Sequence, residues 1–67
     1  MKPMQEIVYD LLDMMAEKNW PKSVKNTMIG AIELAKDERT AAEKVREIIE
    51  TSETPKMAVK AVQPMLR

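Results

Sequence analysis

The chain has 67 residues with 11 basic and 11 acidic side chains, so its formal net charge is zero, and it contains neither cysteine nor histidine. These numbers exclude disulfides, thiolate zinc sites and the side chain that most often acts as an acid–base group near neutral pH. A chain of this length buries only a small core, so we expect tight helix packing or association with a partner to stabilise it.

The first predicted element is an amphipathic helix over about residues 3–18. Pro3 suits the first helical position. Pro21 disfavours helical backbone at the residue before it, so the helix ends there. The apolar residues recur at helical spacing and predict one inward face: Met4, Ile7, Val8, Leu11, Leu12 and Met15.

A second helix is predicted from Pro21 to about Lys36. Gly30 lies in its middle, where glycine costs ~1 kcal/mol relative to alanine. Either another helix approaches closely at Gly30 or the glycine is merely tolerated, and both interpretations stay open. The predicted apolar stripe is Val24, Met28, Ala31, Ile32 and Ala35.

The third helix is predicted to begin with a capping box. Thr40 and Glu43 have the spacing at which a hydroxyl and a carboxylate each satisfy an unpaired backbone N–H group. This helix runs to about Glu50, with Ala41, Ala42, Val45, Ile48 and Ile49 facing inward.

The fourth helix is predicted to open at Thr54 and Pro55. Thr54 is a suitable N-cap and Pro55 a suitable first-turn residue. Pro64 removes a backbone hydrogen bond, so the regular helix ends near Val62 or is kinked there.

Two segments of similar pattern recur thirty-four residues apart and indicate a repeated hairpin. Asp13-Met14-Met15-Ala16 precedes Pro21-Lys22, and Glu47-Ile48-Ile49-Glu50 precedes Pro55-Lys56. The predicted fold is therefore a single all-α domain over residues 1–67. It is an antiparallel four-helix bundle made from two repeated α-hairpins, over about residues 3–36 and 40–66. Net charge alternates in sign from helix to helix, which we expect to favour pairing between neighbours and to select the register.

The runs Trp20-Pro21-Lys22-Ser23-Val24-Lys25-Asn26 and Ala31-Ile32-Glu33-Leu34-Ala35-Lys36-Asp37-Glu38 carry a resemblance to a known family. Over about residues 7–61 the chain resembles a small archaeal family of uncharacterised proteins, uncharacterised protein family 0147. The resemblance implies an up-and-down four-helix bundle and supplies no activity, since that family has no assigned reaction. The chain departs from the family pattern in a shorter third-helix region and in the proline that interrupts the fourth helix.

Lysines stand at the start of the second and fourth helices: Lys22, Lys25, Lys56 and Lys60. Helix N-termini carry partial positive charge and favour acids, so lysines are unusual there. Together with free backbone N–H groups they could contact phosphate or a nucleic-acid backbone. The blander interpretation, which we favour, is that they are solvated lysines facing the acidic first and third helices.

Four apolar or aromatic residues are candidate contacts for a protein partner: Trp20, Met14, Met57 and Tyr9. Flexible methionines suit adaptable surfaces, and an exposed tryptophan suits an interface anchor. The alternatives are that the methionines fill an imperfect core and that Trp20 covers the end of the first hairpin.

Two groups of acidic residues each share one side of a predicted helix: Asp10, Asp13 and Glu17 in the first helix, and Glu43, Glu47 and Glu50 in the third. Di-metal carboxylate bundles combine inward glutamates with histidines, whereas these acids lie outside the apolar stripes. No serine or threonine has a plausible base beside it, and no glycine-rich phosphate loop is present. We therefore expect no catalytic residue, no metal and no cofactor, and hence no enzyme.

The predicted function is a non-enzymatic protein-interaction module that binds another protein or itself. The alternative is a nucleic-acid- or ribosome-associated factor that contacts phosphates through the four lysines, although zero net charge argues against strong non-specific binding. We expect a cytoplasmic protein without membrane contact, because no apolar run approaches the ~18 residues of a membrane span and no signal peptide is visible.

Overall fold

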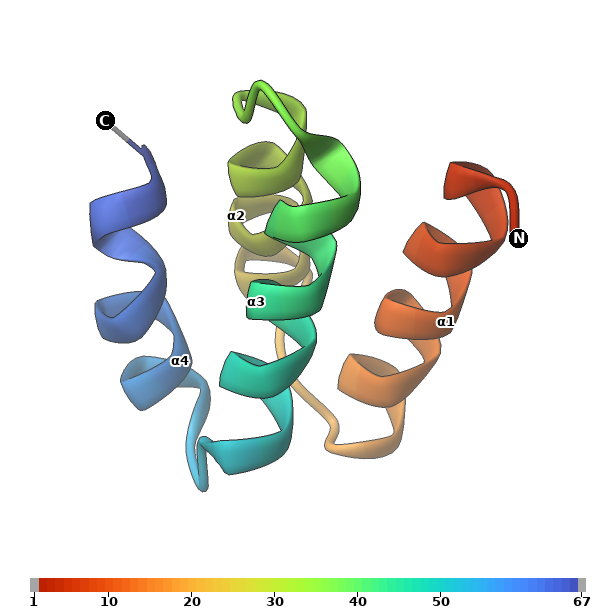
Figure 1. Cartoon of the computed structure of the whole chain (residues 1–67). Coiled ribbons are helices and arrows are strands. Elements are labelled where there is room, and N and C mark those ends of the chain that lie inside the picture. The colour runs from red at the N-terminus through yellow and green to blue at the C-terminus, as the bar shows by residue number, and fades with distance from the viewer. Residues whose placement is uncertain (1, 67) are drawn as a thin grey trace.

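The computed structural model describes residues 2–66, which form four α-helices and a short 3₁₀-helix (Figure 1). The elements are α1 (Met4–Glu17), α2 (Lys22–Glu33), α3 (Glu38–Thr51), α4 (Pro55–Val62) and η1 (Gln63–Leu66). No strand occurs in this part of the chain. The prediction of an all-α, four-helix protein is confirmed, whereas the proposed internal repeat stays a prediction.

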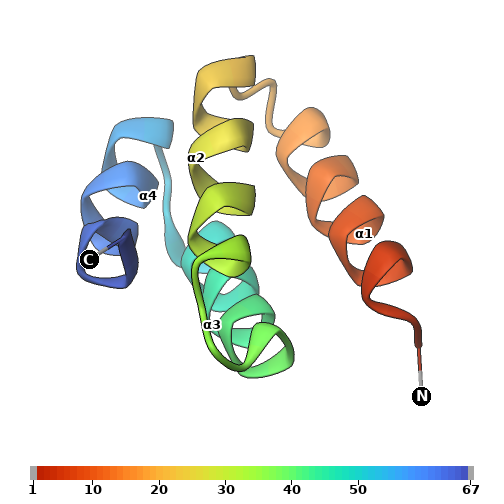
Figure 2. The same ribbon diagram turned by 90° about the horizontal axis from the view of Figure 1, so that it is seen from above.

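The helices α2 and α3 form the centre of the molecule, with α1 and α4 on opposite sides of them (Figures 1 and 2). The chain direction reverses at each connection, so that α2 and α4 begin at the same end of the molecule. However, α1 packs more extensively on α3 than on its sequence neighbour α2. The first predicted hairpin is therefore a loosely packed pair.

One hydrophobic core joins all four helices. Val45 and Ile49 of α3 are completely buried, as are Met28 of α2 and Val62 of α4. The full set is Leu11, Met15, Trp20, Val24, Met28, Ala31, Ile32, Ala41, Ala42, Val45, Ile49, Ala58 and Val62. Small alanines in three of the helices let the backbones approach, which suits a compact core in so short a chain.

The apolar face of α1 is wider than the surface that covers it. Of the six residues predicted to face inward, only Leu11 and Met15 are fully buried. The other four, Met4, Ile7, Val8 and Leu12, are half-buried. Because α1 packs closely on one helix, α3, part of its apolar stripe stays in contact with solvent on the side of α2.

The end of α1 is formed by a Schellman motif. Asn19 adopts a left-handed backbone conformation with φ of 60°. Its N–H donates to the carbonyl of Ala16 (3.0 Å), and the N–H of Trp20 donates to the carbonyl of Met15 (3.1 Å). The reversal directs Trp20 into the core, where its side chain is only 5% exposed.

The predicted capping box of α3 is wrong. Asp37 is the N-cap, and its carboxylate accepts hydrogen bonds from the N–H groups of Arg39 (3.1 Å) and Thr40 (3.2 Å). The hydroxyl of Thr40 donates to the same carboxylate at 2.8 Å, and Thr40 itself lies within the first turn of α3 and not at its N-cap position. A carboxylate at a helix N-terminus is also stabilised by the helix dipole, which explains why the N-cap lies three residues earlier than predicted.

Thr54 and Pro55 open α4 as predicted. The Thr54 hydroxyl accepts from the N–H of Met57 at 3.2 Å, and Pro55 occupies the first turn. The regular helix ends at Val62, also as predicted, and Pro64 lies in the 3₁₀-helix η1 that follows. In contrast, Pro21 precedes α2 as its N-cap residue and does not form part of the helix.

Gly30 does not serve a close helix contact. A Cβ atom placed on it would meet no atom within 4 Å outside its own helical surroundings. Of the two interpretations that were left open, the structure excludes close approach, and tolerance remains.

The two ion pairs within residues 2–66 are local. Lys2 Nζ lies 3.0 Å from Asp10, and Arg46 Nε lies 3.9 Å from Glu50 one turn along α3. Neither joins two of the helices α1–α4, so the alternation of charge does not produce the expected pairing between neighbours. Among residues 2–66, no helix has the length and apolar character needed to cross a lipid bilayer.

Candidate protein-interaction surface

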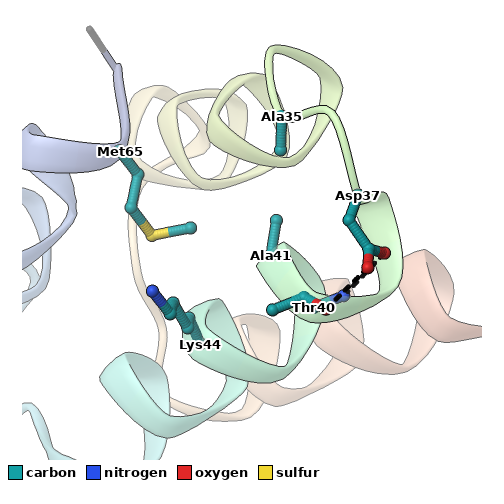
Figure 3. Close-up of a pocket in the computed structure, with 6 residues that line it drawn as sticks. All are labelled: Ala35, Asp37, Thr40, Ala41, Lys44 and Met65. Carbon is teal, nitrogen blue, oxygen red and sulfur yellow. Dashed lines mark hydrogen bonds between the residues drawn. The ribbon is translucent and has the colours of Figure 1, made fainter.

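A hollow beside the N-cap of α3 is lined by Ala35, Asp37, Thr40, Ala41, Lys44 and Met65 (Figure 3). Its volume is about 270 Å³. Its carboxylate, Asp37, is hydrogen-bonded to Thr40, and the three hydrogen bonds of the cap hold its pKa below the usual aspartate value, the hydroxyl of Thr40 first among them. Figure 3 shows Lys44 and Met65 on the other side of the hollow, away from this cap. The Asp37 carboxylate therefore serves as the N-cap of α3.

A longer depression runs between α1 and α2, which we call the α1–α2 groove. One half has a volume of about 320 Å³ and is lined by Met4, Gln5, Val8, Tyr9, Ile29, Ile32, Glu33 and Glu38. The other half has a volume of about 470 Å³ and is lined by Leu12, Asp13, Ala16, Lys22, Lys25 and Asn26. Leu12 of the second half lies one helical turn after Val8 of the first, so the two hollows are adjacent along the same two helices.

The middle of the α1–α2 groove is apolar and incompletely covered. Val8 and Leu12 of α1 and Ile29 of α2 are half-buried. Tyr9 beside them is 56% exposed, and its hydroxyl accepts a hydrogen bond from the Gln5 side chain at 3.2 Å. Tyrosine combines a large apolar ring with a polar tip, and it is enriched where proteins bind one another.

The two ends of the α1–α2 groove carry opposite charge. Glu33 and Glu38 lie at one end of the groove. Lys22 and Lys25 lie at the other end, together with Asp13 of α1. None of these side chains belongs to either of the two ion pairs described above. The groove therefore presents an apolar centre between an acidic end and a basic end.

The predicted interface residues do not form one surface. Trp20 is buried, so the prediction that it is an exposed anchor is wrong, and its place over the end of α1 fits the alternative of a lid. Lys18 lies above its ring, with Nζ 5.5 Å from the ring centroid and 3.4 Å from the carbonyl of Ser52. Met14 is half-buried against the core. Met57 is 50% exposed, but it lies on α4, on the far side of the α2–α3 pair from Tyr9.

The packing of α2 against α4 brings the four predicted phosphate-contacting lysines, Lys22, Lys25, Lys56 and Lys60, partly together. The first turns of α2 and α4 contain no acid, and these two helices pack against each other and begin at the same end of the molecule. Lys22, Lys56 and Lys60 are exposed, and Lys25 is half-buried. The buried position of Trp20 leaves no aromatic platform beside the lysines on which a base could stack.

The acidic side chains of the described residues do not assemble into a metal site. No group of three or more Asp or Glu residues within residues 2–66 has the geometry to hold an ion. The acids of α1 and α3 lie mostly at exposed positions, as their place outside the apolar stripes indicated.

Comparison of the chain with protein-family models, with curated proteins and with solved structures gives no match. The resemblance to the archaeal family of uncharacterised proteins therefore stays a prediction.

Sequence reasoning missed the residues that make the middle of the α1–α2 groove. Val8 and Leu12 were assigned to the core face of α1, and Ile29 was assigned to no face. One signal was available: Ile29 follows the core residue Met28 directly, so the apolar stripe of α2 is wider than a single neighbour can cover.

Proposed function

We propose that this chain is a cytoplasmic, non-enzymatic interaction module whose contact surface is the α1–α2 groove. The observation that carries the proposal is the row of half-buried apolar residues, Val8, Leu12 and Ile29, with the exposed Tyr9 beside them. A groove between two helices with apolar residues at helical spacing is the surface into which an amphipathic helix of a partner fits. Its charged ends would set the direction of that helix.

The test compares capture by two matched variants. Tyr9→Glu places a charge in the groove, whereas Met57→Glu places the same charge on an exposed residue of α4. Both positions are solvent-exposed, so both variants should keep the melting temperature of the unmodified protein within a few degrees.

Proteins captured from nuclease-treated lysate should be lost with Tyr9→Glu and kept with Met57→Glu. Capture that both variants retain, or that both lose, would contradict the assignment of the groove as the contact surface. Quantitative mass spectrometry of the captured proteins measures the difference.

A second candidate function is contact with nucleic-acid phosphates through Lys22, Lys25, Lys56 and Lys60. It is supported by the packing of α2 against α4 with both helix starts, which carry Lys22, Lys25 and Lys56, at one end of the molecule. Lys60 stands in the last turn of α4 and not at its start. Under this candidate, Lys22→Glu/Lys25→Glu and Lys56→Glu/Lys60→Glu should weaken RNA binding alike and flatten its dependence on salt. Fluorescence anisotropy with a labelled single-stranded RNA measures both quantities, and binding unchanged by either variant would remove the candidate.

A further inference from the structure

We propose that the occupant of the α1–α2 groove is a second copy of this chain, docked about a two-fold axis. In this dimer the basic end of α2 in one copy lies against the acidic end of α2 in the other copy. The inference rests on the proposed function, because it names the partner of the same surface.

The charges along α2 are the first argument. Its first turn holds Lys22 and Lys25 and no acid, and its last turn ends at Glu33 with no base. Both features oppose the helix dipole, which favours acids at the N-terminus and bases at the C-terminus. Within one molecule this arrangement is locally unfavourable.

A second copy in antiparallel orientation reverses that effect. It places Glu33 and Glu38 of one molecule opposite Lys22 and Lys25 of the other, and the two-fold axis repeats the contact at both ends of the groove. The dipoles of the two α2 helices would then also oppose each other favourably. A parallel arrangement would set like charges against each other, so the charges select the antiparallel one. Asp13 lies near the basic end and weakens the effect without cancelling it, since two lysines face one acid there.

The contrast with α4 shows that this pattern is not common to all helices of the molecule. Lys56 stands in the first turn of α4, but Lys60 stands in its last turn, so α4 is basic at both ends. Two α4 helices would repel each other in either orientation.

Size and net charge are compatible with self-docking. The accessible surface of the molecule is 4770 Å², and an interface of standard size would cover ~800 Å² of it on each partner. Formal net charge is zero, so two copies do not repel each other at long range. We expect a reversible dimer with a dissociation constant on the order of micromolar.

The test is a charge-swap experiment followed by sedimentation equilibrium over a range of protein concentrations. Lys22→Glu/Lys25→Glu makes both ends of the groove acidic, and Glu33→Lys/Glu38→Lys makes both ends basic. Each variant alone should dimerise at least about tenfold more weakly than the unmodified protein. An equimolar mixture of the two should restore dimerisation as a heterodimer.

Matched controls change the net charge by the same amount away from the groove. Lys56→Glu/Lys60→Glu and Glu47→Lys/Glu53→Lys alter exposed residues of α4 and of the α3 end. They should leave the dissociation constant within about twofold of the unmodified protein at moderate salt.

Three results would overturn the inference. The first is an unmodified protein that stays monomeric at the highest concentrations tested. The second is a dimer that neither groove variant weakens, and the third is a mixture that fails to restore dimerisation. A monomer whose capture of other proteins is still lost with Tyr9→Glu would overturn the self-docking inference and leave the proposed function standing. A protein that neither dimerises nor captures other proteins would overturn both the self-docking inference and the proposed function.

Discussion

The end of α1 and the α1–α2 groove hold the two aromatic residues of the chain in opposite environments. Trp20 at the end of α1 is 5% exposed, whereas Tyr9 in the groove is 56% exposed. At the end of α1, the left-handed backbone at Asn19 reverses the chain and turns Trp20 back onto the core. Tyr9 projects from a continuous helix on the side where no other helix covers it. Backbone geometry and the number of neighbouring helices, and not side-chain hydrophobicity, decide which aromatic residue stabilises the fold and which remains free for a partner.

The largest change in the free energy of unfolding should follow from removing the buried aromatic side chain, Trp20. Trp20→Ala is expected to lower the free energy of unfolding by about 3 kcal/mol or more, because it deletes a large buried side chain and leaves a cavity. A chain this short has little stability in reserve, so much of the variant should be unfolded at physiological temperature. Urea unfolding followed by far-UV circular dichroism measures the change.

The matched control is Tyr9→Ala, which should change the free energy of unfolding by no more than about 0.5 kcal/mol in dilute solution. If Trp20→Ala were as mild as Tyr9→Ala, the two residues would not differ as described, and Trp20 would again be a candidate for partner contact.

A smaller change in the free energy of unfolding, of opposite sign, is expected from a substitution at Gly30. A Cβ atom there meets open space, so Gly30→Ala should raise the free energy of unfolding by up to ~1 kcal/mol through reduced freedom of the unfolded chain. In a domain of this size that corresponds to a rise in melting temperature of roughly 4–8 °C. Differential scanning calorimetry measures it, and a fall in melting temperature would show that α2 has less room at this position than the structure gives it.

The smallest expected effect on stability is the pH dependence that Asp37 contributes as the N-cap of α3. Hydrogen bonds from Thr40 and Arg39 lower the pKa of this carboxyl in the folded protein. Its stabilisation is therefore fully present above the ordinary aspartate pKa of about 3.9 and is lost as the pH falls through the lower value of the folded state.

Asp37→Asn keeps a capping oxygen and removes the titration, so the variant should lose less melting temperature than the unmodified protein between neutral pH and about pH 2. Thermal unfolding in a series of buffers tests this. Parallel curves for the two proteins would mean that the cap carboxylate does not contribute to the pH dependence.

Local features of the fold follow from particular residues. The start of α4 is predictable because Thr54 and Pro55 act within one turn, through a hydroxyl and a fixed backbone angle. The sequence pattern places the start of α3 three residues too late, since both Asp37 and Thr40 are able to cap a helix. Only the geometry shows the hydroxyl of Thr40 donating to the Asp37 carboxylate. The sequence analysis does not predict the Schellman motif at Asn19, because the left-handed position of this motif is usually glycine and only sometimes asparagine.

By itself the sequence determined the helices, most of the core and the absence of disulfides, because helical periodicity, proline positions and composition act locally along the chain. Tertiary structure alone decided that α1 packs mainly on α3 and leaves a groove beside α2, and that Trp20 is buried. It also decided that the charged side chains at the ends of α2 form no ion pair within residues 2–66. These properties depend on which helices share a contact and how closely they approach. An amphipathic pattern indicates that a helix has an apolar face. How much of that face a neighbouring helix covers is set by the packing of all four helices together.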